Sequence, residues 1–224
     1  MNKFATKFVA LVPMKGHSVR VENKNIKDMA GRPLFHYILE TLEKCKYVSK
    51  IYVDTDSEII KEKIHEKFGN VIIISRPKNL IGDTVSMNAI IEYDISQIES
   101  SYFLQTHSTN PLLKTKTIEK SVEFFLSHQE YDSLFTVTRM QKRFYDSKGN
   151  PINHNPKILL NTQNLPHIFE ENSCLYLFTK KSFEINKNRI GKKPHMFEID
   201  KIESIDIDDE FDFELVKKII QTKN

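Results

Sequence analysis

The first residues that could carry chemistry form a basic loop after a short apolar run near the N-terminus. The loop contains Lys15, Gly16, Ser18, Arg20 and Lys24. Lysine and arginine neutralise phosphate charge, the serine hydroxyl donates a hydrogen bond, and a glycine lets the backbone approach a ligand closely. This composition is typical of an anion-binding loop. The alternative is a solvated basic loop on the surface.

A second group of polar residues lies near the C-terminus, in the sequence S-I-D-I-D-D that starts at Ser204. In an extended chain alternate side chains share a face, so we expect Asp206 and Asp208 to point the same way. Two adjacent carboxylates are hard oxygen ligands for Mg²⁺, which usually keeps several waters and also binds substrate phosphates. Asp208 or Asp209 can instead cap the next helix. We favour the cap for Asp209, whereas a cap explains Asp206 poorly.

An alternation of strands and helices must position these two groups. Apolar runs predict strands at 7–12, 50–54, 71–75, 102–105 and 133–138, and apolar residues at helical spacing predict helices at 33–45, 57–67, 86–98 and 115–127. This order favours a three-layer α/β/α fold with a mainly parallel sheet, which binds ligands beyond the carboxyl ends of its strands. The basic loop follows the first strand, so we expect it at that edge.

Further polar residues follow other predicted strands. They are Asp54, Asp56, Arg76, Gln105 and Asn172. Taken singly, each is explained better by a turn or a cap than by a ligand contact. Gln105 and Asn172 have side chains with both a donor and an acceptor, so they could read a base edge or a hydroxyl group.

The strand–helix pattern breaks between residues 139 and 172, where glycine and proline interrupt short mixed segments. A structureless insert of that length is unusual inside a compact domain, so we expect residues 139–172 to fold as an arm, against another subunit. After the arm, the pattern predicts strands at 173–178, 195–199 and 204–208 and a final helix. The 224 residues fit one domain that contains this arm.

Composition excludes several classes of protein. Thirty-three Lys and Arg against 30 Asp and Glu give a net charge of only +3, which does not favour nucleic acid as a partner. Cys45 and Cys174 follow no metal or redox spacing, and no secretory or membrane-spanning segment is evident, so we expect a cytoplasmic protein without a membrane partner. Spaced histidine pairs and the glycine-rich motifs of dehydrogenases, P-loop enzymes and α/β-hydrolases are missing.

Several short motifs occur in a fixed order along nearly the whole chain. They are Lys15, Ser18, Arg20, Lys24 and Asn25 of the loop, V-D-T-D at 53–56, R-P at 76–77, D-T-x-S at 83–86, L-Q at 104–105, N-S-x-L-Y-L at 172–177 and S-I-D-I-D at 204–208. In this order they resemble the CMP-sugar synthetases, specifically the acylneuraminate (nonulosonate) cytidylyltransferases, to which the Kdo cytidylyltransferases are related.

This resemblance implies a Rossmann-like nucleotide-diphospho-sugar transferase fold and a homodimer. It also implies that the anomeric hydroxyl of an acidic 2-keto sugar attacks the α-phosphorus of CTP, with Mg²⁺ as cofactor and pyrophosphate as the leaving group. By this analogy Lys15, Arg20 and Lys24 are catalytic, Met14, Gly16, Ser18, Asn25, Arg76 and Ser86 bind the nucleotide, Gln105 and Asn172 contact the sugar, and Asp206 and Asp208 hold the metal.

The chain departs from the family pattern at four positions. Lys15 replaces a common arginine, Glu22 a proline and Ser173 a glycine, and Thr162 stands where sialic-acid enzymes tend to have an arginine for the sugar carboxylate. Lys157 could supply the missing positive charge. The sugar could therefore be Kdo or another acidic or phosphorylated sugar, and a non-catalytic nucleotide-binding protein is an alternative from another class.

Overall fold

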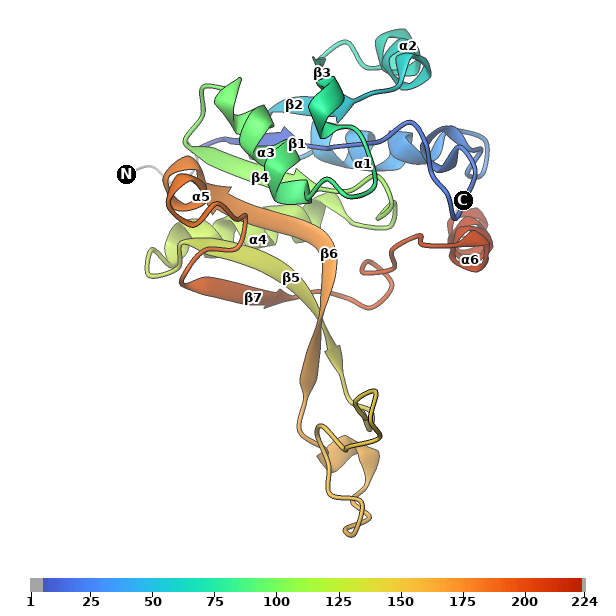
Figure 1. The fold of residues 1–224 in the computed structure, drawn as a ribbon, viewed down its shortest axis with the longest axis vertical. Helices are drawn as coiled ribbons and strands as arrows, with labels where there is room; N and C mark the ends of the chain where they lie inside the picture. The colour runs from blue at the N-terminus through green and yellow to red at the C-terminus, as the bar shows by residue number, and fades with distance from the viewer. Residues whose placement is uncertain (1–5, 223–224) are drawn as a thin grey trace.

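The computed structural model describes residues 6–222 and contains a seven-stranded sheet with helices on both faces (Figure 1). Its strands are β1 Phe8–Leu11, β2 Val48–Thr55, β3 Val71–Ser75, β4 Tyr102–Thr106, β5 Ser133–Met140, β6 Ile168–Thr179 and β7 Pro194–Glu198. Its α-helices are α1 Leu34–Glu43, α2 Glu58–Lys67, α3 Met87–Ser96, α4 Thr115–Ser127, α5 Lys180–Asn186 and α6 Glu210–Gln221. The predicted α/β fold is confirmed.

The strands lie in the order β3-β2-β1-β4-β6-β5-β7, and only β6 runs antiparallel to its neighbours. β1 lies near the middle of the sheet and is covered on both faces, which explains why all four of its residues are buried. Phe8 and Ala10 pack towards α1, α2 and α4, whereas Val9 and Leu11 pack towards α3 and α5. The sheet is therefore the middle of three layers.

A smaller apolar cluster attaches α6 to the rest of the domain. Phe213 and Val216 of α6 pack with Leu34 of α1, with Val21 of the basic loop and with Ile207 just before α6. This cluster brings the two ends of the sequence together. It therefore places the acidic segment before α6 beside the basic loop after β1.

The segment that was predicted to form an arm does leave the sheet, as a ribbon continuous with β5 and β6 (Figure 1). The predicted strand at 173–178 is longer than expected, because residues 168–171 of β6 pair with residues 137–140 of β5. The two strands shift register near Ser173, whose φ of 58° is left-handed. Beyond them, residues 141–167 form turns and one short 3₁₀ helix, Thr162–Asn164.

The prediction of a strand at 204–208 is wrong. Residues 201–204 form a turn, and the chain then runs without a strand partner to the start of α6. Ile207 is held by one backbone hydrogen bond, from its N–H to the carbonyl of Thr109. The alternating S-I-D-I-D pattern therefore reflects Ile207 packing into the α6 cluster rather than a sheet. In the described part of the chain, no helix is long and apolar enough to cross a membrane.

Candidate active site

A pocket of about 420 Å³ opens beyond the carboxyl ends of β1 and β4. The loop after β1 lines it with Met14, Lys15, Ser18, Arg20, Lys24 and Asn25, and Arg76, Asp83 and residues 107–109 complete the wall. This is the edge at which open α/β sheets bind ligands. The structure thus brings together most of the residues that the sequence predicted to bind the nucleotide.

Asn25 fixes the shape of the basic loop. Its side-chain amide donates to the carbonyl of Lys15 at 2.9 Å, and its side-chain oxygen accepts from the Ser108 hydroxyl at 2.6 Å. Asn25 is buried, so these bonds are shielded from water. Asn25 therefore closes the loop on itself and ties it to the loop after β4.

Gly16 has a different role from the one expected. A Cβ atom at this position would lie 2.7 Å from Cβ of Ser57, at the start of α2. The Gly16 N–H donates to the carboxylate of Asp56 at 2.7 Å, and Gly16 does not line the pocket. The glycine lets the loop approach α2 rather than a ligand.

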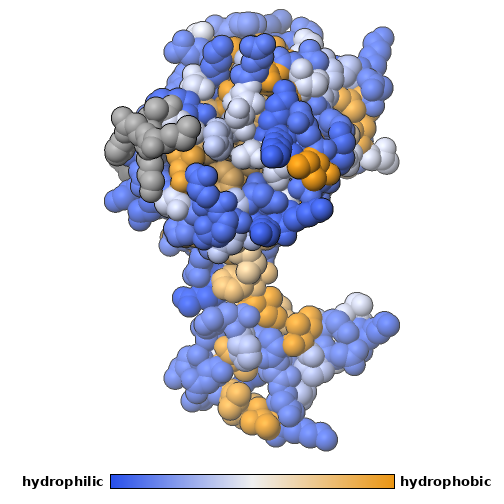
Figure 2. All heavy atoms as spheres, turned by 90° about the vertical axis from the view of Figure 1, so that its left-hand side faces the viewer, coloured by the Kyte–Doolittle hydropathy of each residue, from blue (hydrophilic) through white to orange (hydrophobic). Residues whose placement is uncertain are grey.

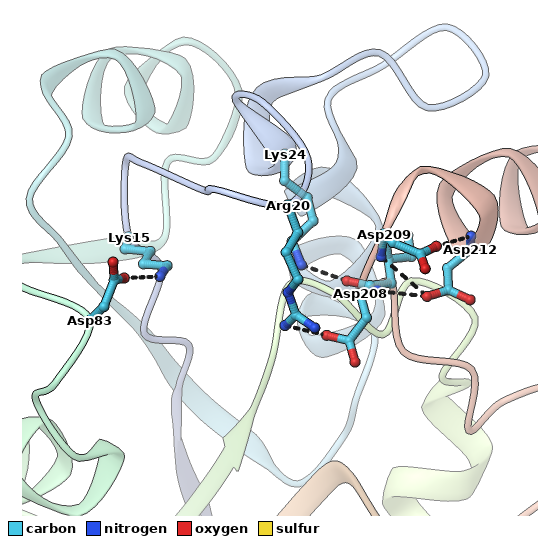
Figure 3. Close-up of polar contacts among 8 residues, drawn as sticks. Lys15, Arg20, Lys24, Asp83, Asp208, Asp209 and Asp212 are labelled. Carbon is cyan, nitrogen blue, oxygen red and sulfur yellow. Dashed lines mark hydrogen bonds and ion pairs between the residues drawn. The ribbon is translucent and has the colours of Figure 1, made fainter.

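Each cation of the loop contacts an acidic or carbonyl oxygen (Figure 3). Lys15 pairs with Asp83 at 2.6 Å across the pocket, and Arg20 pairs with Asp208 at 2.6 Å. Lys24 donates to the carbonyl of Ile207. Burial lowers the pKa of Lys24, while the charges of Asp206 and Asp208 oppose that shift. The basic loop and the acidic segment before α6 thus form one electrostatic unit.

Asp206 provides a half-buried carboxylate near Asp208 in the sequence, and one of its oxygens is fully buried. Its Oδ1 atom has no hydrogen-bond partner among residues 6–222. Burial raises the pKa of Asp206, a hydrogen bond from Thr109 lowers it, and the charge of Asp208 raises it further. Two carboxylates, one with an unpartnered buried oxygen, fit Mg²⁺, which commonly takes one or two carboxylates and fills its octahedron with water and substrate oxygens. The described chain has no cluster of three or more metal-binding side chains.

Asp209 caps α6, as the sequence predicted. Its carboxylate accepts from the N–H of Asp212 at 3.0 Å, and the Asp212 carboxylate accepts from the N–H of Asp209 at 3.2 Å. The N–H of Asp208 also donates to Asp212, at 3.0 Å. This reciprocal capping fixes the backbone that carries the acidic pair.

Arg76 lines the pocket, and its guanidinium is held by an acidic residue. It forms a buried ion pair with Asp54, and the buried carboxyl group of Asp94 of α3 interacts with the same carboxylate. Burial, and then the charge of Asp54, raise the pKa of Asp94 to about 9. The hydroxyl of Ser86, a predicted nucleotide contact, instead caps α3 by accepting from the N–H of Ala89. Ser86 itself does not line the pocket, although its neighbours Val85 and Met87 do.

A second pocket, of about 620 Å³, lies on the other side of the acidic segment. It is lined by Asp206, Asp208 and Asn172 and by residues of β5, β6 and the turn at 201–204. The side chain of Asn172 accepts from the Thr136 hydroxyl at 2.7 Å and donates to the Thr138 hydroxyl at 3.0 Å. The Arg20–Asp208 ion pair joins the two pockets, because each pocket is lined by one of its members.

Gln105 is fully buried and lies between two groups that the sequence analysis did not assign to the site. Its amide nitrogen lies 3.0 Å from Nε2 of His107, and its oxygen accepts from Arg189 at 2.6 Å. Burial lowers the pKa of His107 to about 3, so the imidazole is neutral. Arg189 follows α5 in a turn, where no motif marks it. Lys157 is exposed on the arm and lines neither of the two pockets.

Comparisons with known proteins agree with the motifs. An N-acylneuraminate cytidylyltransferase of Escherichia coli O18:K1:H7 is 27% identical over 98% of this chain, which spans 53% of that protein. The post-translational flagellin modification protein B of Campylobacter coli is 25% identical over 94% of this chain and 93% of its own length. A pseudaminic acid cytidylyltransferase of Campylobacter jejuni serotype O:23/36 is 27% identical, and 94% of this chain covers 95% of it.

Solved structures share the fold. A CMP:2-keto-3-deoxy-manno-octonic acid synthetase complexed with CTP superposes with a TM-score of 0.70 at 13% identity, over 98% of this chain and 100% of the other. The 4-diphosphocytidyl-2C-methyl-D-erythritol synthase of Anaerococcus prevotii gives a TM-score of 0.69 at 13% identity, over 99% of both chains. The sequence profile of the cytidylyltransferase family matches residues 9–223, and the chain therefore belongs to that family of nucleotidyltransferases.

Proposed function

We propose that this protein transfers a CMP group from CTP to the anomeric hydroxyl of a sialic acid-like nonulosonate, an acidic 2-keto sugar, and releases pyrophosphate. The observation that carries the proposal is the Arg20–Asp208 ion pair at 2.6 Å. It joins a pocket lined by lysine and arginine to a pocket lined by carboxylates. The names of the N-acylneuraminate and pseudaminic acid relatives support the substrate class.

The first pocket would bind CTP. Lys15, Arg20 and Lys24 neutralise the triphosphate and the negative charge that develops on the leaving pyrophosphate. Met14, Ser18, Asn25 and Arg76 line the same pocket and would position the nucleotide. Gly16 and Ser86 would act indirectly. Gly16 lets the loop pack closely against the start of α2, and Ser86 caps α3.

Asp206 and Asp208, which line the second pocket, would hold Mg²⁺. When bound, the ion neutralises phosphate oxygens and lowers the pKa of the attacking hydroxyl. The chain contributes alignment: Lys24 holds the Ile207 carbonyl between the two aspartates, and the capped start of α6 fixes Asp208. Phosphoryl transfer depends mainly on such positioning and charge neutralisation. The second pocket, lined by Asn172, would receive the sugar, whereas Gln105 is buried and contacts His107 in the wall of the first pocket.

A second copy of the chain would complete the enzyme through the arm. Figure 2 shows hydrophobic patches on the part of the molecule that extends below the main body. The exposed large apolar side chains of the arm are Tyr145, Ile152, Ile158, Leu159, Leu160 and Phe169. Apolar surface of this kind favours association, and Lys157 on the same arm would reach the partner's sugar. Leu159→Glu should shift the mass measured by light scattering from dimer to monomer. If the wild type and the variant both have the mass of a monomer, the proposed dimer is wrong.

The two cysteines support a cytoplasmic enzyme. Cys45 and Cys174 are both buried free thiols, which suits a reducing compartment.

The direct test measures pyrophosphate release from CTP and Mg²⁺ with N-acetylneuraminic acid, pseudaminic acid or Kdo as acceptor. We expect release with a nine-carbon acid, and none when UTP or ATP replaces CTP. If pyrophosphate is released only with Kdo, the acceptor is Kdo rather than a nonulosonate. If pyrophosphate is released with UTP or ATP but not with CTP, the assignment of cytosine as the base is wrong. CTP binding without turnover on any acceptor would favour a non-catalytic nucleotide-binding protein.

A further inference from the structure

We propose that Arg189 binds the carboxylate of the acidic sugar and that Gln105 and Tyr176 hold its guanidinium in place. This inference rests on the proposed function, because it assigns the acceptor of that reaction to a particular cation. Arg189 would supply the positive charge that sialic-acid enzymes tend to have as an arginine at the position of Thr162. It would also set the preference of the enzyme for acidic over neutral sugars.

The position of Arg189 is built from two adjacent strands. Gln105 of β4 and Tyr176 of β6 are direct partners in the sheet, so their side chains lie next to each other on one face. The guanidinium carbon of Arg189 stacks 3.6 Å from the centre of the Tyr176 ring, and one of its nitrogens donates to Gln105 at 2.6 Å. Stacking and a hydrogen bond together orient the planar guanidinium.

Arg189 has no carboxylate of its own. Within residues 6–222, no acidic oxygen lies within 4 Å of its guanidinium, whereas the buried Arg76 pairs directly with Asp54. Burial lowers the pKa of Arg189, while Tyr176 and the charge of Glu171 oppose the shift. Arginine nevertheless remains charged in proteins. A half-buried cation without a paired anion is costly, and a ligand carboxylate would offset that cost.

The turn that carries Arg189 is held by several hydrogen bonds. Its backbone N–H donates to Asn88 of α3 at 3.3 Å, and the next two N–H groups donate to Asn188 at 2.9 Å and to Ser133 at 2.7 Å. Gly191 lies so close to Asp132 that an added Cβ would be 2.3 Å from its carboxylate. A fixed backbone means that the guanidinium loses little freedom when it binds an anion.

The neighbours of Arg189 connect it to both pockets. Gln105, which accepts its hydrogen bond, also contacts His107 in the wall of the first pocket. Tyr176, on which it stacks, is hydrogen-bonded through its hydroxyl to Glu171 and Ser173, which line the second pocket. Arg189 itself lines neither pocket, and it is linked to the wall of each through these hydrogen-bonded neighbours. Its fork matches a planar carboxylate, which it can bind through two parallel hydrogen bonds.

The test compares Arg189→Gln and Arg189→Lys with a matched control, Arg32→Gln. Arg32 also stacks on a tyrosine, at 3.9 Å from the Tyr37 ring, but its guanidinium already pairs with the carboxylate of Glu40. We expect Arg189→Gln to raise KM for the acidic sugar about 10- to 100-fold, since a hydrogen bond to a charged group is lost. KM for CTP should change less than about twofold, and Arg189→Lys should recover part of the loss.

The methyl ester of the same sugar gives the decisive comparison, because it removes the charge and keeps the ring. The wild type should prefer the acid over the ester, and Arg189→Gln should lose most of that preference. An unchanged preference in Arg189→Gln, or an equal rise in KM for CTP, would overturn the assignment. A sugar phosphate that binds wild type more tightly than the carboxylic acid, in an Arg189-dependent way, would overturn the carboxylate assignment as well.

Direct binding separates this inference from the proposed reaction. Calorimetry with N-acetylneuraminic acid or pseudaminic acid needs no turnover. If the wild type binds an acidic sugar that it does not convert, and Arg189→Gln loses that binding, the proposed CMP-transfer reaction is wrong. The assignment of Arg189 to the sugar carboxylate is then still supported. If the wild type binds no acid of the panel, both are wrong. Thermal denaturation of Arg189→Gln and Arg189→Lys checks that each variant is folded before binding is measured.

Discussion

Arg20 and Asp208 lie 2.6 Å apart, although one belongs to the first loop of the chain and the other to the segment before its last helix. Each side chain therefore pairs with the group whose charge the other would offer to a phosphate or to a metal ion. Arg20→Ala should therefore raise KM for CTP about 10- to 100-fold, the range for losing one hydrogen bond to a charged group. Steady-state kinetics against Arg32→Ala, whose ion pair with Glu40 is 2.7 Å long, checks this. An unchanged KM for CTP in Arg20→Ala would contradict the assignment of Arg20 to the triphosphate.

Gly16 should tolerate a side chain only if α2 makes room for it. Gly16→Ala would place a Cβ 2.7 Å from Cβ of Ser57, so the variant should lower the melting temperature and weaken CTP binding. Ser57→Gly removes the clashing atom and costs only a few tenths of a kcal/mol, because glycine is also accepted as a helix cap. The double variant should therefore be more stable than Gly16→Ala alone. Additive losses in the double variant would show that the clash is not the cause.

Asp94→Asn should stabilise the protein more as the pH rises. Burial raises the pKa of Asp94 to about 9, so the folded protein keeps a proton that the unfolded chain releases above its ordinary value of 3.8. Wild-type stability from this group is complete below pH 3.8 and is lost as the pH rises towards 9, by up to about 1.4 kcal/mol per pH unit. Asparagine can donate to Asp54 without titrating. Melting temperatures at pH 5, 7 and 9 should show a growing difference, and a constant difference would contradict this account.

Asp209 should matter for stability and not for the metal. Asp209→Ala removes the cap of α6 and should lower the free energy of unfolding by about 1 kcal/mol. Asp209→Asn keeps a capping oxygen and should preserve both stability and the dependence of turnover on Mg²⁺ concentration. A large loss of Mg²⁺-dependent turnover in Asp209→Asn, with the fold intact, would make Asp209 a metal ligand instead.

The sequence predicted the parts of this protein that depend on local pattern. Alternating apolar runs and helical periodicity were sufficient for the three-layer fold, and the cap at Asp209 followed from its position before a helix. The basic loop and the acidic pair were recognisable because each is a short cluster of one kind of charge. The structure adds that the small apolar cluster around α6 brings them together.

The features that sequence reasoning missed depend on contacts between distant residues. The 204–208 segment looked like a strand, but a strand needs a partner and none of the described strands pairs with it. Gly16 is required by Ser57 rather than by a ligand. Arg189 acquires its surroundings only when β4 and β6 pair and place Gln105 beside Tyr176. None of these contacts leaves a periodic or motif-like trace in the chain.

We propose that the basic loop and the Asp206–Asp208 pair form one Mg²⁺-dependent cytidylyltransferase site. Pyrophosphate release from CTP and an acidic sugar, measured as Mg²⁺ is titrated, tests it most directly when wild type is compared with Asp206→Asn and Asp208→Asn. We predict Mg²⁺-dependent release by the wild type, and a loss of about 100-fold or more in each variant without a change in fold. Release by both variants at the wild-type rate and with the same Mg²⁺ dependence would contradict the claim.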